Sequence, residues 1–133
     1  MYGRSNYKMT TKQAATFIIR GRLDGLNEYT KACRSNKYSG ARMKNKNENI
    51  VGAALWGNNI GRYNSKVHIT FKWYEENKKR DIDNIAFAKK FILDTLVDYE
   101  VLQGDSWKYI AGFTDEFYTD KDNPRIEVII KEV

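Results

Sequence analysis

The stretch KVHITFKWY at residues 66–74 decides the fold, because apolar and polar side chains alternate along it without interruption. Successive side chains of a β-strand point to opposite faces of the sheet, so this pattern predicts a half-buried strand. The side chains expected to face the core are Val67, Ile69, Phe71 and Trp73. Such a strand belongs to a sheet with one covered face.

The segments on both sides of this strand have extended or helical patterns. The predicted strands are 16–21, 107–118 and 125–133, and the predicted helices are 26–36, 41–57 and 83–99. The buried stripe of the helix at 41–57 is expected to consist of Ile50, Ala53, Ala54 and Trp56. The order β-α-α-β-α-β-β predicts an α+β fold, in which helices pack on one mixed sheet.

The length and composition fit one globular domain. A chain of 133 residues with 41% hydrophobic and 14% aromatic residues suits a single domain over 1–133, with residues 1–14 as a flexible tail. A single cysteine, Cys33, excludes an intrachain disulfide and favours a reducing compartment. No apolar run reaches the roughly 18–20 residues of a membrane span, and the polar N-terminus lacks the apolar segment of a signal peptide. We therefore expect a cytoplasmic protein without membrane contact.

Charge is distributed unevenly along the chain, whose net charge is +6. Residues 1–46 carry 11 lysines and arginines against two acids, a net of +9, whereas residues 47–133 carry 12 against 15, a net of −3. This asymmetry indicates a polyanion bound by one part and a cation bound by the other, as in a protein that binds nucleic acid and a metal ion. The basic side chains expected to grip DNA phosphates are Lys31, Arg34, Lys37, Arg42, Lys44 and Lys46. Alternatively, the same residues form a solvated helix face.

The helix at 83–99 begins with a concentration of charge in the sequence KKRDIDN at residues 78–84. Asp81 and Asp83 stand two residues apart at a chain reversal, where their carboxylates repel each other unless they share a cation such as Mg²⁺, which prefers oxygen ligands. Asp105, in the sequence GDS, is a third carboxylate after the helix. The alternative is structural, with Asp81 as a helix N-cap and Asp105 as a turn residue.

The spacing along this helix separates two groups of acids. Asp83, Lys90 and Asp94 share one polar stripe of a continuous helix, at about 100° per residue. Asp94 would lie roughly 16 Å along the axis from Asp83, too far for one ion to bind both. Asp94 is therefore expected to be structural, binding a backbone donor or Lys90.

Two short motifs in this order resemble the RusA family of Holliday junction resolvases, including its prophage-encoded members. The first is Asp81-x-Asp83-Asn84, followed by a helix that carries Lys90 and the sequence Asp94-Thr95-Leu96. The second is Asp105-Ser106 after a short loop. The resemblance is firmest over residues 79–109, and the stretch 25–48 is also similar to the N-terminal part of the phage branch.

The resemblance implies a small homodimeric endonuclease that cuts four-way DNA junctions. Its cofactor would be Mg²⁺, for which Mn²⁺ can substitute, and no nucleotide cofactor is expected. The resemblance further implies that Asp81, Asp83 and Asp105 bind the metal and that Lys90 completes the catalytic set. Other residues near the first motif are expected to support the site: Lys79 and Arg80 as DNA contacts, and Asn84, Lys89 and Asp94 in secondary roles.

The chain departs from the family pattern at two positions. The family lysine usually stands about one turn after the second aspartate, where this chain has Phe87, and Lys90 comes about two turns after it. Lys89 or Lys79 could therefore take the role of this lysine. The acid that often precedes the last aspartate is replaced by Gly104, so the site would have one outer carboxylate fewer.

Two other functions are compatible with the same residues. One is a basic DNA-binding module without catalysis, in which Asp81 caps the helix and Asp105 makes a turn. The other is a metal-dependent nuclease that acts on a different DNA structure. Cleavage that depends on Mg²⁺ separates the first of these from a resolvase.

Overall fold

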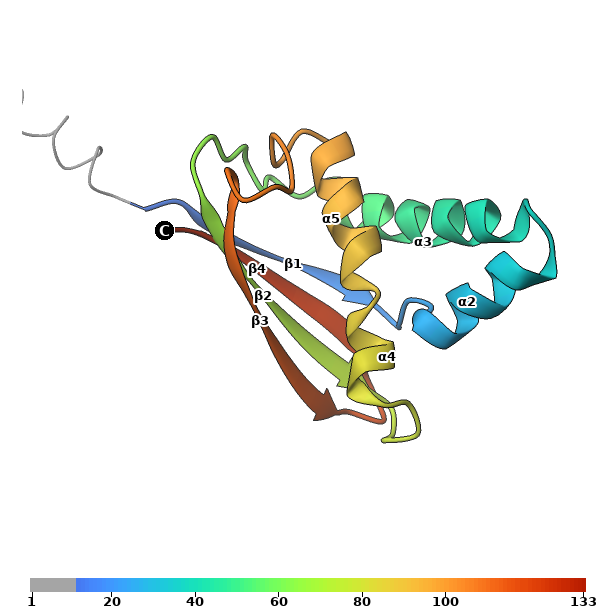
Figure 1. Ribbon diagram of the computed structural model, residues 1–133. Helices are drawn as coiled ribbons and strands as arrows, with labels where there is room; N and C mark the ends of the chain where they lie inside the picture. Colours follow the sequence, from blue (N-terminus) through green and yellow to red (C-terminus); the bar gives the residue numbers. More distant parts are fainter. Residues whose placement is uncertain (1–11) are drawn as a thin grey trace, which may run out of the picture.

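A computed structural model describes residues 12–133, in which helices pack against one β-sheet (Figure 1). The strands are β1 (Ala14–Arg20), β2 (Val67–Glu75), β3 (Ile110–Thr119) and β4 (Arg125–Glu132). The helices are α2 (Leu26–Ser35), α3 (Ser39–Leu55), α4 (Ile82–Ala86) and α5 (Lys89–Asp98). The predicted α+β class and the predicted order of elements are confirmed, although the helix expected at 83–99 is divided into α4 and α5.

The strands form one mixed sheet in the order β1-β4-β2-β3. β4 runs antiparallel to both β1 and β2, whereas β2 and β3 are parallel. Parallel neighbours need a crossover connection, and α4 with α5 provides it. Because β2 and β3 are parallel and in register up to Glu75 and Thr119, both strands end at the same edge of the sheet.

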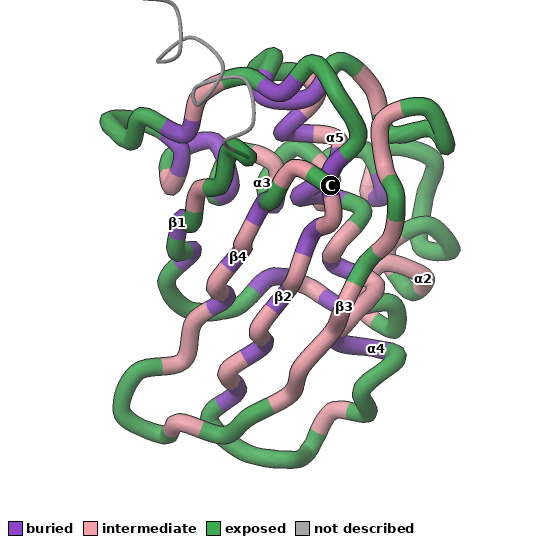
Figure 2. Tube along the Cα trace, turned by 90° about the vertical axis from the view of Figure 1, so that its left-hand side faces the viewer, coloured by how far each residue is buried: buried purple, intermediate pink, exposed green. Residues whose placement is uncertain are grey.

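The helices cover one face of the sheet and leave the other face open (Figures 1 and 2). The alternation predicted for β2 is confirmed, and its buried apolar side chains are Val67, Ile69, Phe71 and Trp73. From the helical layer, Phe91, Ile92 and Leu96 of α5 enter the same core. Removing this apolar surface from water, at about 25 cal/mol per Å², is the main force that holds α5 on the sheet.

A break at Phe87 and Ala88 divides the predicted helix. The amide of Ala88 donates to the carbonyl of Ile85 at 3.2 Å, and the amide of Lys90 donates to Phe87 at 3.0 Å, so the chain tightens to three-residue bonds. The Phe87 ring packs against Tyr29 of α2 at 5.4 Å between centroids and edge-on against Phe91 at 5.7 Å. These aromatic contacts, one of them to a distant helix, accompany the change of direction.

The buried stripe predicted for α3 is wrong in its phase. Val51 and Leu55 are buried, whereas Ile50 is 36% exposed and Trp56 84% exposed. Ala53 is also exposed, and of the predicted stripe only Ala54 packs against the core. The buried face of α3 also includes Asn47, one turn before Val51. The side chain of this polar residue is hydrogen-bonded, which makes its burial tolerable.

The described chain begins closer to the sheet than the predicted tail over residues 1–14 allows. Ala14 already belongs to β1, and the backbone of Gln13 exchanges hydrogen bonds with Glu132, at 2.7 Å to its Oε1 and 2.8 Å from its amide. Residues 1–11 of that prediction lie outside the described residues. None of the helices within 12–133 has the length and hydropathy of a membrane span.

A buried ion pair fixes the loop where β2 ends. The guanidinium of Arg80 donates from Nε and Nη2 to the two carboxylate oxygens of Glu75, at 3.1 and 2.8 Å, and from Nη1 to the carbonyl of Leu23 at 3.1 Å. The two side chains are 10% and 9% exposed. Arg80, which the sequence predicts to contact DNA, directs one donor from each of its three guanidinium nitrogens to protein groups.

We predict that Glu75→Gln lowers the free energy of unfolding by about 3 kcal/mol, since it removes the carboxylate that Arg80 binds with two hydrogen bonds and leaves only Glu28, at 3.7 Å, near the buried charge. Urea unfolding followed by circular dichroism measures this. The matched control is Arg62→Gln, which removes the pair with Glu100; both of those side chains are about 70% exposed, so the loss should stay within about 1 kcal/mol. Equal small losses in both variants would contradict the stabilising role of the buried pair.

Candidate functional site

The two ends of the segment RDIDN, residues 80–84, are anchored inside the protein. Arg80 is held by Glu75, as described above, and Asn84 is only 5% exposed. The Asn84 side chain accepts a hydrogen bond from the amide of Asn27, in the first turn of α2, at 2.8 Å. A Cβ at Gly25 would lie 2.5 Å from the Asn84 carbonyl oxygen, so only glycine allows this approach.

Between these anchors, Asp81 and Asp83 are exposed to solvent. Asp81 occupies the N-cap position of α4 with an extended backbone, at φ −69° and ψ 153°, but its side chain makes no capping hydrogen bond. No lysine or arginine among residues 12–133 lies within 4 Å of either carboxylate. The capping alternative therefore does not account for Asp81, and neither aspartate has a lysine or arginine partner in this part of the fold.

Asp105 belongs to a different group of charges, which we call the α3–α5 network and which consists of Lys44, Glu48, Lys90, Asp94 and Asp105. The Lys90 ammonium lies 3.2 Å from Asp94 and 3.9 Å from Asp105. Asp94 also lies 3.3 Å from Lys44. The ion pair that the sequence predicts between Asp94 and Lys90 is therefore present.

The structure does not bring Asp105 to the first two aspartates. Within residues 12–133, no three or more acid, histidine or cysteine side chains are close enough together to hold a metal ion. Asp105 instead joins Lys90 and Asp94, and the loop that follows α5 lies at the opposite end of the α4–α5 pair from the start of α4 (Figure 1). The three carboxylates predicted to share one metal thus divide into the Asp81–Asp83 pair and the α3–α5 network.

The lysines expected to assist catalysis are also engaged elsewhere. Lys89 donates to Asp115 of β3 at 2.6 Å and lies over the Phe113 ring at 5.0 Å, with 20% of its side chain exposed. Lys90 is held in the α3–α5 network. By contrast, Lys78 and Lys79 are exposed directly before the aspartate pair and form no ion pair with the acids of the described chain. Lys78 was missed by the sequence reasoning, although the run KKR beside the motif was a signal for it.

The hairpin of α2 and α3 projects from the side of the sheet (Figure 1) and carries the predicted phosphate grip. The members of that grip that are exposed and form no ion pair within the described chain are Lys31, Arg34, Lys37 and Arg42. The remaining two are paired: Lys44 with Glu48 and Asp94, and Lys46 with Asp24. Their pairing leaves a narrower basic surface than the sequence predicts, on α2 and the first turns of α3.

A hydrogen-bonded group around Asp24 attaches this hairpin to the end of β1. Asp24 receives hydrogen bonds from Lys46 and from the buried side chain of Asn47, both at 2.8 Å, and its amide donates to Asn47 at 2.9 Å. Burial by itself raises the pKa of the Asp24 carboxyl, but the bonds from Lys46 and Asn47 outweigh it and lower the pKa below its ordinary value of 3.8. A carboxylate that is stabilised in this way contributes to folding only while it is ionised.

We predict that Asp24→Asn costs about 1 kcal/mol of unfolding free energy at pH 7. Because the folded state lowers the pKa of Asp24, this contribution is complete above pH 3.8 and is lost as the pH falls through the folded value. Urea titrations between pH 7 and pH 2.5 should show the two proteins converge at the acidic end. A constant difference across this range would contradict the ionic role.

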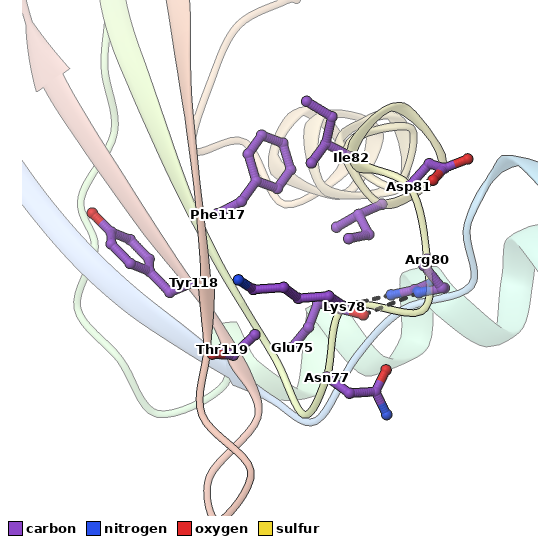
Figure 3. A pocket seen from close by; sticks show the side chains of 10 residues that line it. Glu75, Asn77, Lys78, Arg80, Asp81, Ile82, Phe117, Tyr118 and Thr119 are labelled. Atoms are coloured by element: carbon purple, nitrogen blue, oxygen red, sulfur yellow. Dashed lines mark hydrogen bonds and ion pairs between the residues drawn. The ribbon is translucent and has the colours of Figure 1, made fainter.

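A cavity of about 730 Å³ opens beside Asp81, between the β2–α4 loop, the start of α4 and the end of β3 (Figure 3). Ile82, Ile85 and Phe117 supply its apolar lining. Lys78 lies along it in Figure 3. The cavity therefore combines an apolar surface with an unpaired cation, and of the two aspartates only Asp81 borders it.

No protein-family model matches the chain, and no curated protein matches it either. A function is accordingly inferred from the geometry of the residues above together with the two motifs.

Proposed function

We propose that this chain is a Mg²⁺-dependent endonuclease of the RusA type, which resolves four-way DNA junctions during recombination and repair. The observation that carries the proposal is the state of Asp81 and Asp83. Both carboxylates are exposed, neither is paired with a cation of the described chain, and Asp81 does not cap the helix that it precedes. The anchors at Arg80 and Asn84 fix the backbone on both sides of the two aspartates, which supports a defined position for a bound cation.

Two carboxylates are a sufficient protein contribution for Mg²⁺. This ion keeps several waters and is commonly bound through one or two carboxylates together with substrate phosphates. We therefore assign Asp81 and Asp83 as the metal-binding pair, and Mn²⁺ would suit the same oxygen donors. Bound there, the metal would neutralise charge on the reacting phosphate and activate a water. Asp105 acts at a distance from this pair, through the charges of the α3–α5 network.

The remaining charges of the chain position the DNA. The exposed lysines and arginines of the α2–α3 hairpin bind backbone phosphates, and Lys79 lies beside the aspartates, where it can receive the reacting phosphate. The Asn27–Asn84 hydrogen bond ties the start of this hairpin to the acidic segment. DNA whose phosphates bind the hairpin is thereby brought close to the segment that carries Asp81 and Asp83. Of the lysines considered, Lys79 is our choice for the catalytic cation, because Lys89 and Lys90 are engaged with acids.

A homodimer fits this substrate, since a four-way junction has two strands to cut symmetrically and a two-fold dimer presents two equivalent sites. Phosphate contacts alone carry no sequence information, so the described basic surface is equally suited to other branched DNA. Cleavage of a flap or a three-way branch by the same metal site is therefore the second candidate function.

The decisive experiment incubates the purified chain with a synthetic four-way junction, a flap and a matched linear duplex, each with and without Mg²⁺, and maps the cuts on every strand. We expect paired symmetrical nicks in the junction only, and only with Mg²⁺. Cuts confined to the flap would favour the second candidate. Tight binding of all three without any cut would leave a DNA-binding module and overturn the nuclease proposal.

We predict that Asp83→Asn reduces junction cleavage at least a hundredfold, while junction binding is unchanged or tighter, because one charge that repels phosphate is removed. Asp105→Asn should retain more cleavage than Asp83→Asn, since Asp105 lies with Lys90 rather than with the carboxylate pair. Cleavage rates and Kd values from gel shifts measure both effects. If Asp83→Asn and Asp105→Asn lost cleavage equally, this would contradict the assignment and indicate that Asp105 also binds the metal.

We also predict that replacing Arg34 and Arg42 with Ala weakens junction binding and flattens its salt dependence. Each lost phosphate contact should reduce the slope of log K against log salt by roughly 0.9. The slope is measured by fluorescence anisotropy at salt concentrations from about 50 to about 300 mM. Lys131→Ala is the matched control, because Lys131 is an exposed cation on β4, away from the hairpin. An unchanged slope in the double variant would identify the hairpin as a merely solvated surface.

A further inference from the structure

The cavity beside Asp81 has an unusual apolar component. Ile82 stands between the two aspartates, and 60% of this isoleucine is exposed. Figure 3 shows that Ile82 and Phe117 point toward one another across the cavity, from α4 and from β3. Phe117 comes from the edge strand of the sheet and is only partly buried. The core does not need Ile82, because the neighbouring Ile85, 4% exposed, already fills the inward position of α4.

The polar groups around this apolar slot are specific in kind. The Lys78 side chain runs along the cavity toward β3, and Asn77 and Thr119 stand at its rim (Figure 3). The pair of Glu75 and Arg80 at the base is already saturated by its own hydrogen bonds. Tyr118 turns away, and its ring stacks on Tyr74 on the open face of the sheet at 4.8 Å between centroids. A ligand in the cavity would therefore contact the Lys78 ammonium and the apolar surface of Ile82 and Phe117.

These features match one ligand chemistry, a nucleotide. Ile82 and Phe117 offer apolar contact to a flat base, Lys78 offers a charge partner to an anionic phosphate, and a volume of about 730 Å³ falls within the range of small-ligand pockets. We propose that the cavity receives the base of one unstacked DNA nucleotide, whose own or adjacent phosphate lies at Lys78 and next to Asp81, the aspartate that borders the cavity. This inference rests on the proposed nuclease function and specifies its substrate: DNA in which a base next to the cut is free to leave the stack, as at a branch point.

Stacking on an apolar or aromatic side chain explains why such a slot favours branched over continuous DNA. Extracting a base from an intact duplex costs unstacking and unpairing energy, and this cost is least where the base is already unpaired. The contact tolerates all bases, because every base presents a π-face. The pocket thus selects for DNA structure, whereas the hairpin binds phosphates of any DNA.

The test couples a change in the DNA to a change in the pocket. Single abasic sites are placed in turn at the nucleotides nearest the branch of a four-way junction, and binding is measured by anisotropy with Mg²⁺ in an Asp83→Asn background. At one position, removal of the base should weaken binding about tenfold. Adding Ile82→Ser should itself weaken binding of the intact junction, and should reduce the abasic effect to less than twofold. Ile18→Ser, a 40% exposed isoleucine on β1, is the matched control and should leave the tenfold effect intact.

Lys78→Ala provides a second variant that does not touch the core, and it should weaken binding of the intact and abasic junctions alike, since it removes the phosphate contact.

Free 2-aminopurine deoxynucleotide tests whether the pocket binds free nucleotides instead. If its fluorescence is quenched as strongly as that of the same base within the junction, the pocket would be assigned to free nucleotides and the inference would be overturned. An abasic effect that survives Ile82→Ser, or no sensitive position at all, would also overturn it. If Ile82→Ser sediments as a monomer where the wild-type chain sediments as a dimer, and the abasic effect on binding is unchanged, the slot would be assigned to contact with a second copy of the chain and the inference would be overturned.

The two proposals fail separately. If the wild-type chain cuts junctions with Mg²⁺ but Ile82→Ser behaves as Ile18→Ser does, the nuclease stands and the base pocket is wrong. If no DNA is cut, the abasic coupling in binding still reports whether a base occupies the cavity.

Discussion

Glu75 and Arg80 hold each other at the point where β2 leaves the sheet, and the arrangement of the site depends on this pair. The pair closes the loop at the common end of β2 and β3, and a third bond from Arg80 to the Leu23 carbonyl draws in the chain after β1. A pair this buried gains little net stability over apolar packing, but it tolerates only one geometry. That geometry sets the direction in which α4 begins, and hence the position of Asp81.

Opposite charges are kept apart in this fold by structure as well as by sequence. The acids near the basic hairpin, Asp24, Glu48 and Asp94, form ion pairs with Lys44 and Lys46. The other four basic side chains of the hairpin form no ion pair within the described chain. The aspartate pair is likewise left without a neighbouring cation, although lysines at 78, 79, 89 and 90 surround it in sequence. Each lysine that could neutralise it from α5 is directed to another acid. Such segregation leaves a positive surface on the hairpin and a negative one at the start of α4, which the proposed binding of phosphate and of a metal ion would use.

Local patterns in the sequence predicted the strands and most helices, because alternation and amphipathic periods are properties of a few neighbouring residues. The break at Phe87 and the exposed side of α3 could not be predicted, since they depend on contacts that Tyr29 and Asn47 make with distant parts of the chain. The position of Asp81 and Asp83 at the start of a helix was predictable from the sequence. The separation of Asp105 from these two residues was not, because the loop after α5 has no pattern that encodes its direction, and the partner of Lys89 lies in β3.

The break between α4 and α5 also makes the site independent of the length of the helix that follows it. In one continuous helix, each inserted residue would rotate everything beyond it by about 100° relative to the start. Here α4 is oriented by the Arg80 and Asn84 anchors and α5 by its own apolar packing, so the two can adjust separately. The length of α5 can therefore change without changing the direction in which Asp81 and Asp83 leave the start of α4.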